Sequence, residues 1–378
     1  MRRKKFVLLF AILLLSGCGH MVEIQYQAYA VGIGVDYKEE KFHVYLQFMD
    51  FSNLAKTEGS SINIEKPVWI GAGKGNTIDE ALIDIYKGMQ IKVNYDQMQI
   101  FLFSKNAIDH KLNDIIESLD TNFNFRLSGY VYGTEENLQE ILTSKMPFYY
   151  PYITSHLAQP LDTHSLASDL PPLETEEMII RSTEKTKMLI IPKVVMNKNI
   201  IHKDTHILPV PVIKGAYFNR GYDYLGSINK EDLTGYIKFN SNSERSLIHL
   251  YYDESDSTPI SIEVRDPKDK KSVKKEDGQE RYQLTIKVSV ILREGAENRD
   301  PLKVEKRFIE EVKKDVMASI NKAKNIGADI YQFEDYLYRH EHKLWEENKH
   351  DSMLEAFTID DITVDITYVK SISKIYGK

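Results

Sequence analysis

The sequence predicts a multi-lobed α+β (mixed α/β) protein, with mixed and antiparallel sheets, packed amphipathic helices and a long helix on a sheet near the C-terminus. Three observations lead to this fold class. Strand and helix patterns alternate through the first 150 residues, apolar residues recur with a period of two after residue 210, and one long helical stripe follows at residues 304–323. Alternating strands and helices indicate a mixed α/β domain, whereas long helices beside antiparallel strands indicate an α+β unit.

An antiparallel hairpin is predicted near the beginning of the N-terminal region. Val31, Ile33 and Val35 share one face of a strand over residues 29–35, and apolar residues alternate again over 42–48, after a polar turn at 36–41. The elements predicted after this hairpin are a helix from residue 78, a strand at 98–103, a helix at 108–119, a strand at 127–132 and a helix at 135–142.

The glycine-rich segment at residues 71–77 does not have the spacing of a phosphate-binding loop. Such a loop ends in Gly-Lys followed directly by Ser or Thr, and here two residues separate Lys74 from Thr77. Thr77 and Glu80 instead have the Thr-x-x-Glu spacing of a capping box, which predicts the start of a helix.

The C-terminal half has a sheet pattern followed by a helical one. The long helix is predicted from an apolar stripe formed by Val304, Phe308, Val312, Val316, Ile320 and Ala323, and Gly327 is a suitable left-handed residue after its end. The other predicted elements are strands at 189–195, 210–218, 247–252, 260–264, 284–292 and 362–368, a hairpin at 221–226, a charged loop at 268–278 and a second helix at 330–345.

The domain organisation follows from changes in composition. Prolines at 160, 171 and 172 and an acidic run at 174–177 indicate a connector between two halves. We expect a signal peptide at 1–17, an N-terminal α/β domain at 18–157, a connector and middle segment at 158–210, and a C-terminal α+β region at 211–378. The last region can itself divide into two lobes near 255–300.

The only cysteine, Cys18, follows a pattern typical of bacterial export. Residues 2–5 are basic, residues 6–15 are apolar, and Leu15, Ser16 and Gly17 precede the cysteine. The apolar run is too short to cross a hydrocarbon core of roughly 30 Å as a stable helix. Leu-Ser-Gly-Cys is also the pattern of a lipobox, in which the cysteine sulfur receives a diacylglycerol and the new N-terminus an acyl chain such as palmitate. The alternative is a buried structural cysteine behind an N-terminal membrane helix.

A lipobox predicts a protein anchored by lipid to the outer face of a membrane, because about two acyl chains are needed for stable anchoring and a diacylglyceryl cysteine supplies both. Removing the four positive charges of the signal peptide from the formal charge of −7 leaves −11. An acidic protein is mildly repelled by anionic lipids, which argues against a headgroup-binding surface, and nucleic-acid binding requires a basic one.

The sequence shows no arrangement typical of an enzyme. His340 and His342 are two residues apart, so that on a helix they point in different directions, and His202 and His206 flank a polar turn. No Gly-x-Ser-x-Gly motif or dinucleotide-binding fingerprint is present, and lipidation would consume the only thiol. We therefore predict no metal, no cofactor apart from the lipid on Cys18, and a binding or assembly role.

Several segments in order resemble the C-subunit lipoproteins of spore germinant receptors, the GerAC family. The resemblance covers almost the whole chain and lies in residues 30–36, 75–86, 97–103, 214–218, 225–226, 244–245, 327–330, 333, 336–339 and 344–345. One departure is visible, because Gly19 and His20 stand where the family often has a Trp-Asp pair. The resemblance therefore implies nothing about the contacts made by the residues directly after Cys18.

The resemblance implies a peripheral, non-catalytic subunit of a nutrient receptor in the inner membrane of spores. Its partners would be the integral-membrane A and B subunits, and its role would be receptor assembly or the signalling that triggers germination. Protein–protein surfaces are often rich in aromatic residues, so Tyr149, Tyr150 and Tyr152 are a candidate partner surface, although such tyrosines also serve as core or rim residues.

Two other function classes remain open from the sequence. A solute-binding lipoprotein would deliver a small ligand to a membrane transporter, but such proteins normally have two similar α/β lobes, and the N-terminal pattern is not repeated in the second half. An anchored hydrolase of unknown type is the third alternative.

Overall fold

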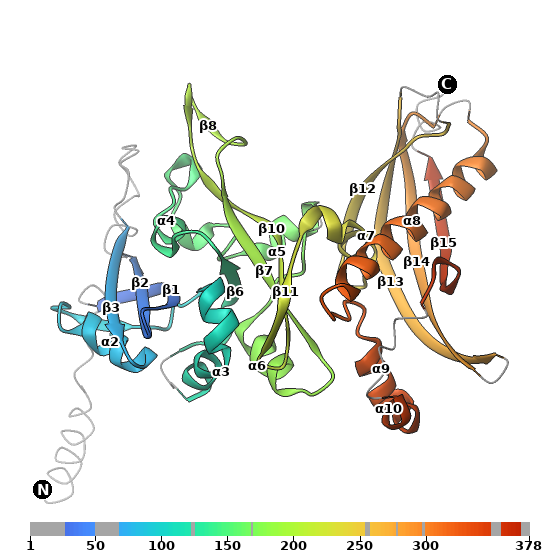
Figure 1. Ribbon diagram of the computed structural model, residues 1–378. Coiled ribbons are helices and arrows are strands. Elements are labelled where there is room, and N and C mark those ends of the chain that lie inside the picture. The colour runs from blue at the N-terminus through green and yellow to red at the C-terminus, as the bar shows by residue number, and fades with distance from the viewer. Residues whose placement is uncertain are drawn as a thin grey trace, which may run out of the picture.

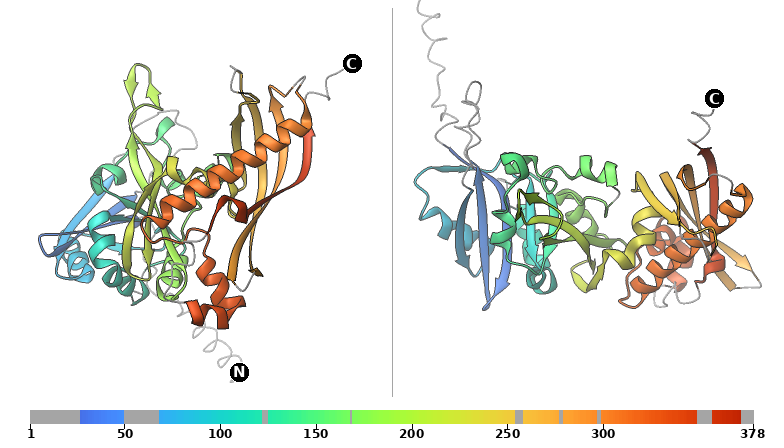
Figure 2. Two further views of the ribbon diagram at one scale, coloured as in Figure 1. Left: turned by 45° about the vertical axis from the view of Figure 1, so that its right-hand side comes forward. Right: turned by 90° about the horizontal axis from the view of Figure 1, so that it is seen from above.

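The computed structural model describes residues 27–49, 68–121, 125–167, 169–253, 258–276, 279–296, 299–348 and 357–371. Figures 1 and 2 show two sheets arranged side by side in an elongated molecule, with their helices packed around them. We call residues 27–229 the N-terminal lobe and residues 230–371 the C-terminal lobe. The predicted α+β (mixed α/β) fold class is confirmed, with one mixed sheet and one mainly antiparallel sheet.

The N-terminal lobe contains a nine-stranded mixed sheet with the order β11-β10-β7-β6-β5-β1-β2-β3, and β4 pairs with β1 outside this path. Neighbouring strands from β1 through β5 and β6 to β7 are parallel, and the pairs towards both edges are antiparallel. The strands are β1 (Gln27–Lys38), β2 (Lys41–Met49), β3 (Trp69–Gly75), β4 (Lys92–Asn94), β5 (Ile100–Ser104), β6 (Tyr130–Thr134), β7 (Met188–Asn197), β10 (Val210–Arg220) and β11 (Asp223–Asn229).

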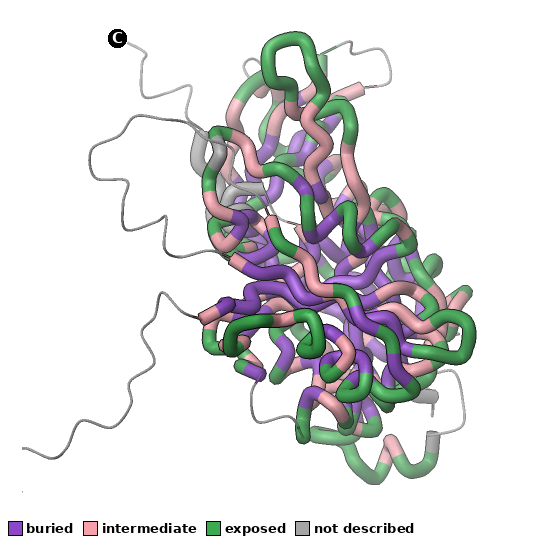
Figure 3. Tube along the Cα trace, turned by 90° about the vertical axis from the view of Figure 1, so that its left-hand side faces the viewer, coloured by how far each residue is buried: buried purple, intermediate pink, exposed green. Residues whose placement is uncertain are grey.

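Helices cover both faces of this sheet. One face packs against α2, α3 and α6, and the other against α4 and the segment around residue 152. In β5 the alternation is direct, because Phe101 and Phe103 belong to the first core and Ile100 and Leu102 to the second. Figure 3 shows these buried strands between exposed turns and loops. The helices are α2 (Ile78–Tyr86), α3 (Lys105–Thr121), α4 (Leu138–Leu142), α5 (Pro160–Ala167) and α6 (Thr175–Thr183).

The predicted N-terminal hairpin is confirmed, and β1 and β2 pair with Tyr37 opposite Phe42. The glycines of the 71–77 segment have a packing role. A Cβ atom added at Gly73 would lie 2.1 Å from the carbonyl oxygen of Ala81, and one at Gly71 would lie 2.7 Å from Ile85 Cγ2. Glycine therefore allows α2 to lie directly on β3.

The predicted start of α2 is also confirmed, but one of the two hydrogen bonds of the capping box has a different donor. Thr77 Oγ1 accepts a hydrogen bond from Glu80 N at 3.1 Å, as a capping box requires. The Glu80 carboxylate, however, accepts from the backbone N–H of Asn76 at 2.7 Å, one residue before the cap.

The nine-stranded sheet continues through the segment for which the sequence predicts a connector. Strand β7 lies within residues 158–210, β10 begins at Val210 and β11 at Asp223, and all three pair in the N-terminal sheet. Ahead of these strands, the proline-containing part after residue 147 packs on one face of the sheet through Tyr152 and Leu157, and α6 then leads into β7.

The C-terminal lobe is a four-stranded sheet with one long helix across it, as Figure 2 shows. Strands β12 (Arg245–Leu250), β13 (Ile260–Glu276) and β14 (Gln279–Glu294) are antiparallel, and β15 (Ile362–Ser371) is parallel to β14. Helix α8 (Pro301–Lys324) begins where Asp300 Oδ1 accepts a hydrogen bond from Leu302 N at 3.1 Å. All six residues of the predicted apolar stripe are buried.

Two predictions in this lobe are wrong. The charged segment at 268–278 was expected to be a loop, but Lys268 to Glu276 extend β13 and pair with β14, because cross-strand partners such as Leu284 hold the strand despite its lysines. The second helix is interrupted at Glu341, whose φ of −135° is not helical, so that α9 (Phe333–His340) and α10 (His342–Asn348) are separate.

Candidate functional site

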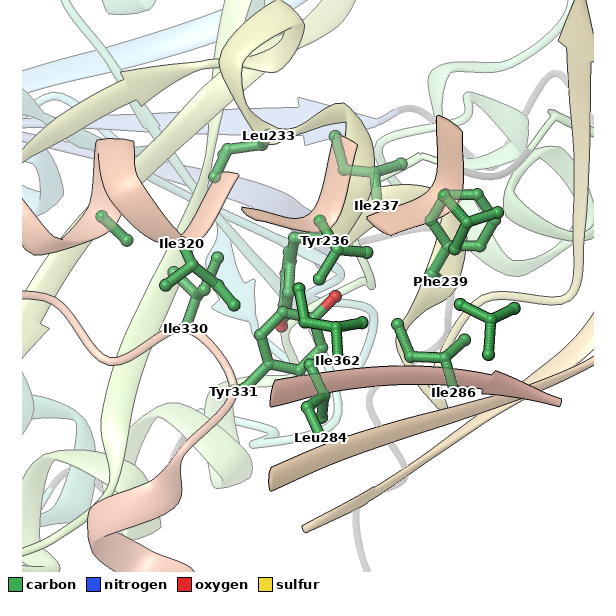
Figure 4. Close-up of a cluster of buried hydrophobic side chains, with 14 of the residues drawn as sticks. Leu233, Tyr236, Ile237, Phe239, Leu284, Ile286, Ile320, Ile330, Tyr331 and Ile362 are labelled. Carbon is green, nitrogen blue, oxygen red and sulfur yellow. The ribbon is translucent and has the colours of Figure 1, made fainter. Parts of the chain in front are cut away.

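The contact between the two lobes, which we call the junction, contains a continuous hydrophobic core. Ala216 and Phe218 of β10 belong to the same cluster as Tyr236 of α7 (Thr234–Phe239) and Ile320 of α8. Figure 4 shows side chains of α7, α8 and the C-terminal sheet converging on this core. A Cβ atom added at Gly235 would lie 2.2 Å from the carbonyl oxygen of Asp315, so α7 and α8 are in backbone contact there.

Polar contacts also cross the junction beside α9. Arg339 Nη2 lies 2.5 Å from Glu184 Oε2 at the end of α6, and Thr186 Oγ1 donates a hydrogen bond to Asp335 Oδ1 at 3.0 Å. Arg339 Nε also donates to both carboxylate oxygens of Asp335 at 3.0 Å. The four side chains thus form one network that joins α9 to the N-terminal lobe.

Further contacts join the lobes near α5 and on either side of α7. His164 Nε2 donates to the backbone carbonyl oxygen of Asn242 at 2.9 Å, and Lys230 Nζ donates to Asp169 Oδ2 at 2.7 Å. A shared core with polar contacts on several sides shows that the two lobes are packed together as one unit.

A pocket of about 350 Å³ opens in the C-terminal lobe next to the α9 network. Its walls come from the end of α7, from β13 and from the segment that leads into α9. The residues most important for its chemistry are Tyr236, Ser241, Asp269, Lys271, Tyr331 and Arg339. Asp335 of the network also lines it, so the pocket and the junction share residues.

The Asp269 carboxylate accepts three hydrogen bonds in the pocket. Its Oδ1 accepts hydrogen bonds from Ser241 N at 2.7 Å and Ser241 Oγ at 2.5 Å, and Lys271 Nζ donates to Oδ2 at 2.7 Å. Burial alone would raise the pKa of Asp269, but the Lys271 ammonium and these hydrogen bonds outweigh it, so that the pKa is lowered. The carboxylate is therefore ionised and neutralised by its own neighbours.

Asp329 is buried directly before Ile330, which lines the pocket, and its pKa is shifted in the opposite direction from that of Asp269. Its Oδ2 accepts a hydrogen bond from Glu334 N at 2.9 Å at the start of α9. Burial raises the pKa of Asp329 from 3.8 to about 6, with a smaller contribution from the Glu334 charge. Burial also raises the pKa of Tyr236 to about 12, so this phenol is neutral at physiological pH.

A second charged cluster lies on the face of the C-terminal sheet that α8 does not cover. Glu263 of β13 is fully buried, and its carboxylate is paired with Arg245 at 3.0 Å, with Arg265 at 2.5 Å and with Arg293 Nε at 2.7 Å. Burial opposes ionisation, but the three arginines lower the pKa of Glu263 overall. The cluster joins β12, β13 and β14.

The structure separates the predicted partner tyrosines. Tyr150 is 62% exposed, and Phe148, with φ of 59°, is 83% exposed beside it. Tyr152 is only 7% exposed, and its hydroxyl donates to the carbonyl oxygen of Ile141 at 2.8 Å. Tyr152 thus has the core role that the sequence left open as the alternative for these tyrosines. Tyr149 ends a 3₁₀ turn (Pro147–Tyr149).

The lipobox residues Leu15, Ser16, Gly17 and Cys18 lie outside the described residues. Within the described ranges, no group of three or more His, Cys, Asp or Glu side chains could hold a metal ion. His340 and His342 each contact a ring of their own helical segment, Tyr336 and Trp345 respectively. No helix in the described part of the chain is long and apolar enough to cross a membrane.

Sequence reasoning missed the junction and its pocket. Asp269 and Lys271 lie in the segment that was predicted to be a solvated loop, and Arg339 has no sequence signal for its contact with Glu184, 155 positions away. The one available signal was the resemblance of residues 327–330 and 336–339 to the GerAC family, because these residues surround the pocket.

The overall fold is similar to that of a solved structure, the crystal structure of the GerBC protein. The two chains are 15% identical, the match covers 93% of this chain and all of that chain, and the TM-score is 0.55. The likeness shows that a protein with a similar overall fold has been seen in a crystal structure.

Two family domains together account for most of the chain and define a spore germination protein. The "Spore germination protein N-terminal domain" matches residues 20–196, and the "Spore germination B3/GerAC like, C-terminal" domain matches residues 213–374. The chain belongs to the GerAC family of spore germination proteins, which confirms the resemblance seen in the sequence. No curated protein matches the chain.

Proposed function

We propose that this protein is the lipid-anchored, non-catalytic subunit of a nutrient germinant receptor in the inner membrane of spores. The observation that carries the proposal is the position of the lipobox. Cys18 lies two residues before the start of the N-terminal family match, and the two family domains then run to residue 374. Processing at Cys18 would thus leave the whole family region tethered to the outer face of the membrane by a diacylglycerol and an N-terminal acyl chain.

The two-lobed body supports a role in assembly or signalling with integral-membrane A and B subunits. A continuous core and polar contacts at the junction hold the two lobes in one orientation. Surfaces on different lobes then keep a constant spacing, which suits a subunit that bridges membrane partners. Phe148 and Tyr150 are an exposed aromatic pair that fits a partner surface.

The test is a Cys18→Ala variant expressed in spores that lack any redundant receptor. We expect loss of the protein from the inner membrane and loss of germination with nutrients, while germination by a trigger that bypasses the receptor is retained. A matched Leu302→Ala variant changes an exposed residue of the C-terminal lobe and should behave as the wild type. Normal nutrient germination by Cys18→Ala, at a normal protein level, would contradict the proposal.

A solute-binding lipoprotein is the second candidate, and the pocket of about 350 Å³ beside α9 is the observation that favours it. A thermal-shift screen with amino acids, sugars and purines separates the two functions. A binding protein at a hundredfold ligand excess over Kd is stabilised by about 2.7 kcal/mol. A germinant-receptor subunit that acts through docking gives no such shift.

A further inference from the structure

The exposed apolar residues of α2, β3 and β4 gather at the point where the described chain begins. Strand register places Gln27 beside Lys92, Tyr29 beside Met49, and Phe48 beside Trp69. The start of β1, the end of β2 and the starts of β3 and β4 thus share one end of the sheet. At about 4.8 Å per strand, they lie within roughly 15 Å of one another.

Helix α2 returns to the same end. A Cβ atom added at Gly75 would meet Glu80 and Ala81, whereas one added at Gly71 would meet Ile85, so the helix runs antiparallel to β3. Its last residue, Tyr86, therefore lies at the Trp69 end of the strand.

Large apolar side chains are exposed at this end. Trp69 is 63% exposed, and Ile83, Tyr86 and Ile91 are also exposed. Ile83 and Tyr86 are three residues apart and share a face of α2. Isolated apolar residues on a surface are normal, but a gathered set that includes Trp and Tyr is typical of a contact surface. We call Trp69, Ile83, Tyr86 and Ile91 the exit patch.

A hollow of about 320 Å³ lies beside the exit patch, and Tyr86 and Ile91 of the patch form part of its wall. It is lined by Tyr86, Met89, Ile91, Val93 and Tyr95, with the Lys92 side chain contributing the charged part. At the end of α2, Lys87 is paired with Asp84 at 3.1 Å, so this pair adds no net charge to the surface.

From these observations we infer that the exit patch rests on the lipid bilayer and orients the protein on the membrane. The inference relies on the lipid anchor of the proposed function. Nine residue steps separate Cys18 from Gln27, and a fully extended chain of that length spans at most about 30 Å. An anchored protein therefore has its exit patch within reach of the headgroup layer at all times.

The chemistry of the patch fits the interfacial layer of a bilayer. Trp and Tyr are enriched at membrane–water interfaces, where the ring is buried and its polar tip is hydrated, and Ile adds apolar area. The contact is made by apolar and aromatic groups, so the net negative charge of the protein does not oppose it as it would oppose binding to anionic headgroups. Figure 1 shows α2 and β3 at the end of the molecule farthest from the C-terminal lobe, which leaves the junction free for protein partners.

The two tryptophans of the chain allow a direct test, because Trp69 is in the exit patch and Trp345 is in the C-terminal lobe. The full chain, purified with whatever modification the cell attaches, is reconstituted in phosphatidylcholine vesicles as Trp345→Phe, which leaves Trp69, or as Trp69→Phe, which leaves Trp345. We expect brominated phosphatidylcholine to remove most of the Trp69 emission and to leave the Trp345 emission unchanged, at low and at high salt.

Variants test the patch without changing its fluorophore. Ile91→Glu in the Trp345→Phe chain should lose most of the quenching of Trp69, whereas the matched exposed-residue control Leu302→Glu should retain it. Vesicle flotation separates the anchor from the orientation. A chain that floats with the vesicles but shows equal quenching of both tryptophans overturns the exit-patch inference alone. A chain that does not float overturns the anchor as well as the orientation that depends on it.

Discussion

Asp329 should make the stability of the C-terminal lobe fall as pH rises from about 4 to about 7. Its pKa is raised from 3.8 in the unfolded chain to about 6 in the folded protein. Between these values the folded state holds a proton that the unfolded state has lost. The stabilising contribution of the neutral carboxyl is therefore complete below the unfolded pKa and is lost as pH rises through the folded pKa.

The size of the effect follows from the two pKa values. A difference of about two pKa units at 1.36 kcal/mol per unit corresponds to about 3 kcal/mol. Asp329→Asn removes the titration but keeps an oxygen that can accept the hydrogen bond from Glu334 N. We expect this variant to gain about 2 kcal/mol relative to the wild type on going from pH 4 to pH 7, because the unfolded carboxyl is already partly ionised at pH 4.

The assay is urea unfolding at several pH values in a Trp69→Phe background, in which the remaining Trp345 reports on the C-terminal lobe. Asp329→Ala is the matched control, because it also abolishes the titration but loses the acceptor at the start of α9, at a pH-independent cost of about 1 kcal/mol. Parallel stability curves for Asp329→Asn and the wild type between pH 4 and pH 7 would refute the reasoning.

Four further changes test the packing and the charge networks, each by urea unfolding. Tyr152→Phe removes one of two donors to the Ile141 carbonyl oxygen, which keeps its hydrogen bond from Ser144 N, and should destabilise the protein by about 0.5–1.5 kcal/mol; a neutral result would contradict its structural role. A double-mutant cycle of Glu184→Ala and Arg339→Ala should give a coupling below about 1 kcal/mol, because the pair is half-exposed, and the coupling should shrink in high salt; a salt-independent value would argue against a direct ion pair. Glu263→Gln should cost about 1–3 kcal/mol at neutral pH and progressively less as pH falls through the lowered pKa of Glu263, and a constant difference would disprove this linkage. Gly235→Ala should destabilise by about 1–3 kcal/mol through contact with α8, so an unchanged midpoint would mean that α7 and α8 are farther apart.

Local patterns predicted much of the secondary structure. The stripe from Val304 to Ala323 gave the buried face of α8, because a helix repeats every 3.6 residues and its apolar side chains must face a core. The β1–β2 hairpin and the start of α2 followed from similarly short-range signals, strand alternation and a capping residue. In each case the residues that decide the structure are close together in the sequence.

Long-range pairing could not be predicted in the same way. The parallel contact between β14 and β15 brings Leu284 beside Ile362, and no periodicity within either strand records which partner it takes. The pocket has the same origin, since Asp269 and Tyr331 meet only after β13 and the α9 segment pack together. The lysine-rich part of β13 does not follow the predicted loop, because an exposed strand face accepts lysine as readily as a loop does.

The parallel position of β15 has a consequence for the order in which the protein can mature. The last strand of the C-terminal sheet is supplied by residues 362–371, and Ile362 belongs to the hydrophobic core that extends into the N-terminal lobe. The ribosome must therefore have synthesised the chain through β15 before this core can close. A truncation before Ile362 would remove β15 and leave the backbone N–H and C=O groups along one edge of β14 unpaired. An unpaired strand edge promotes aggregation.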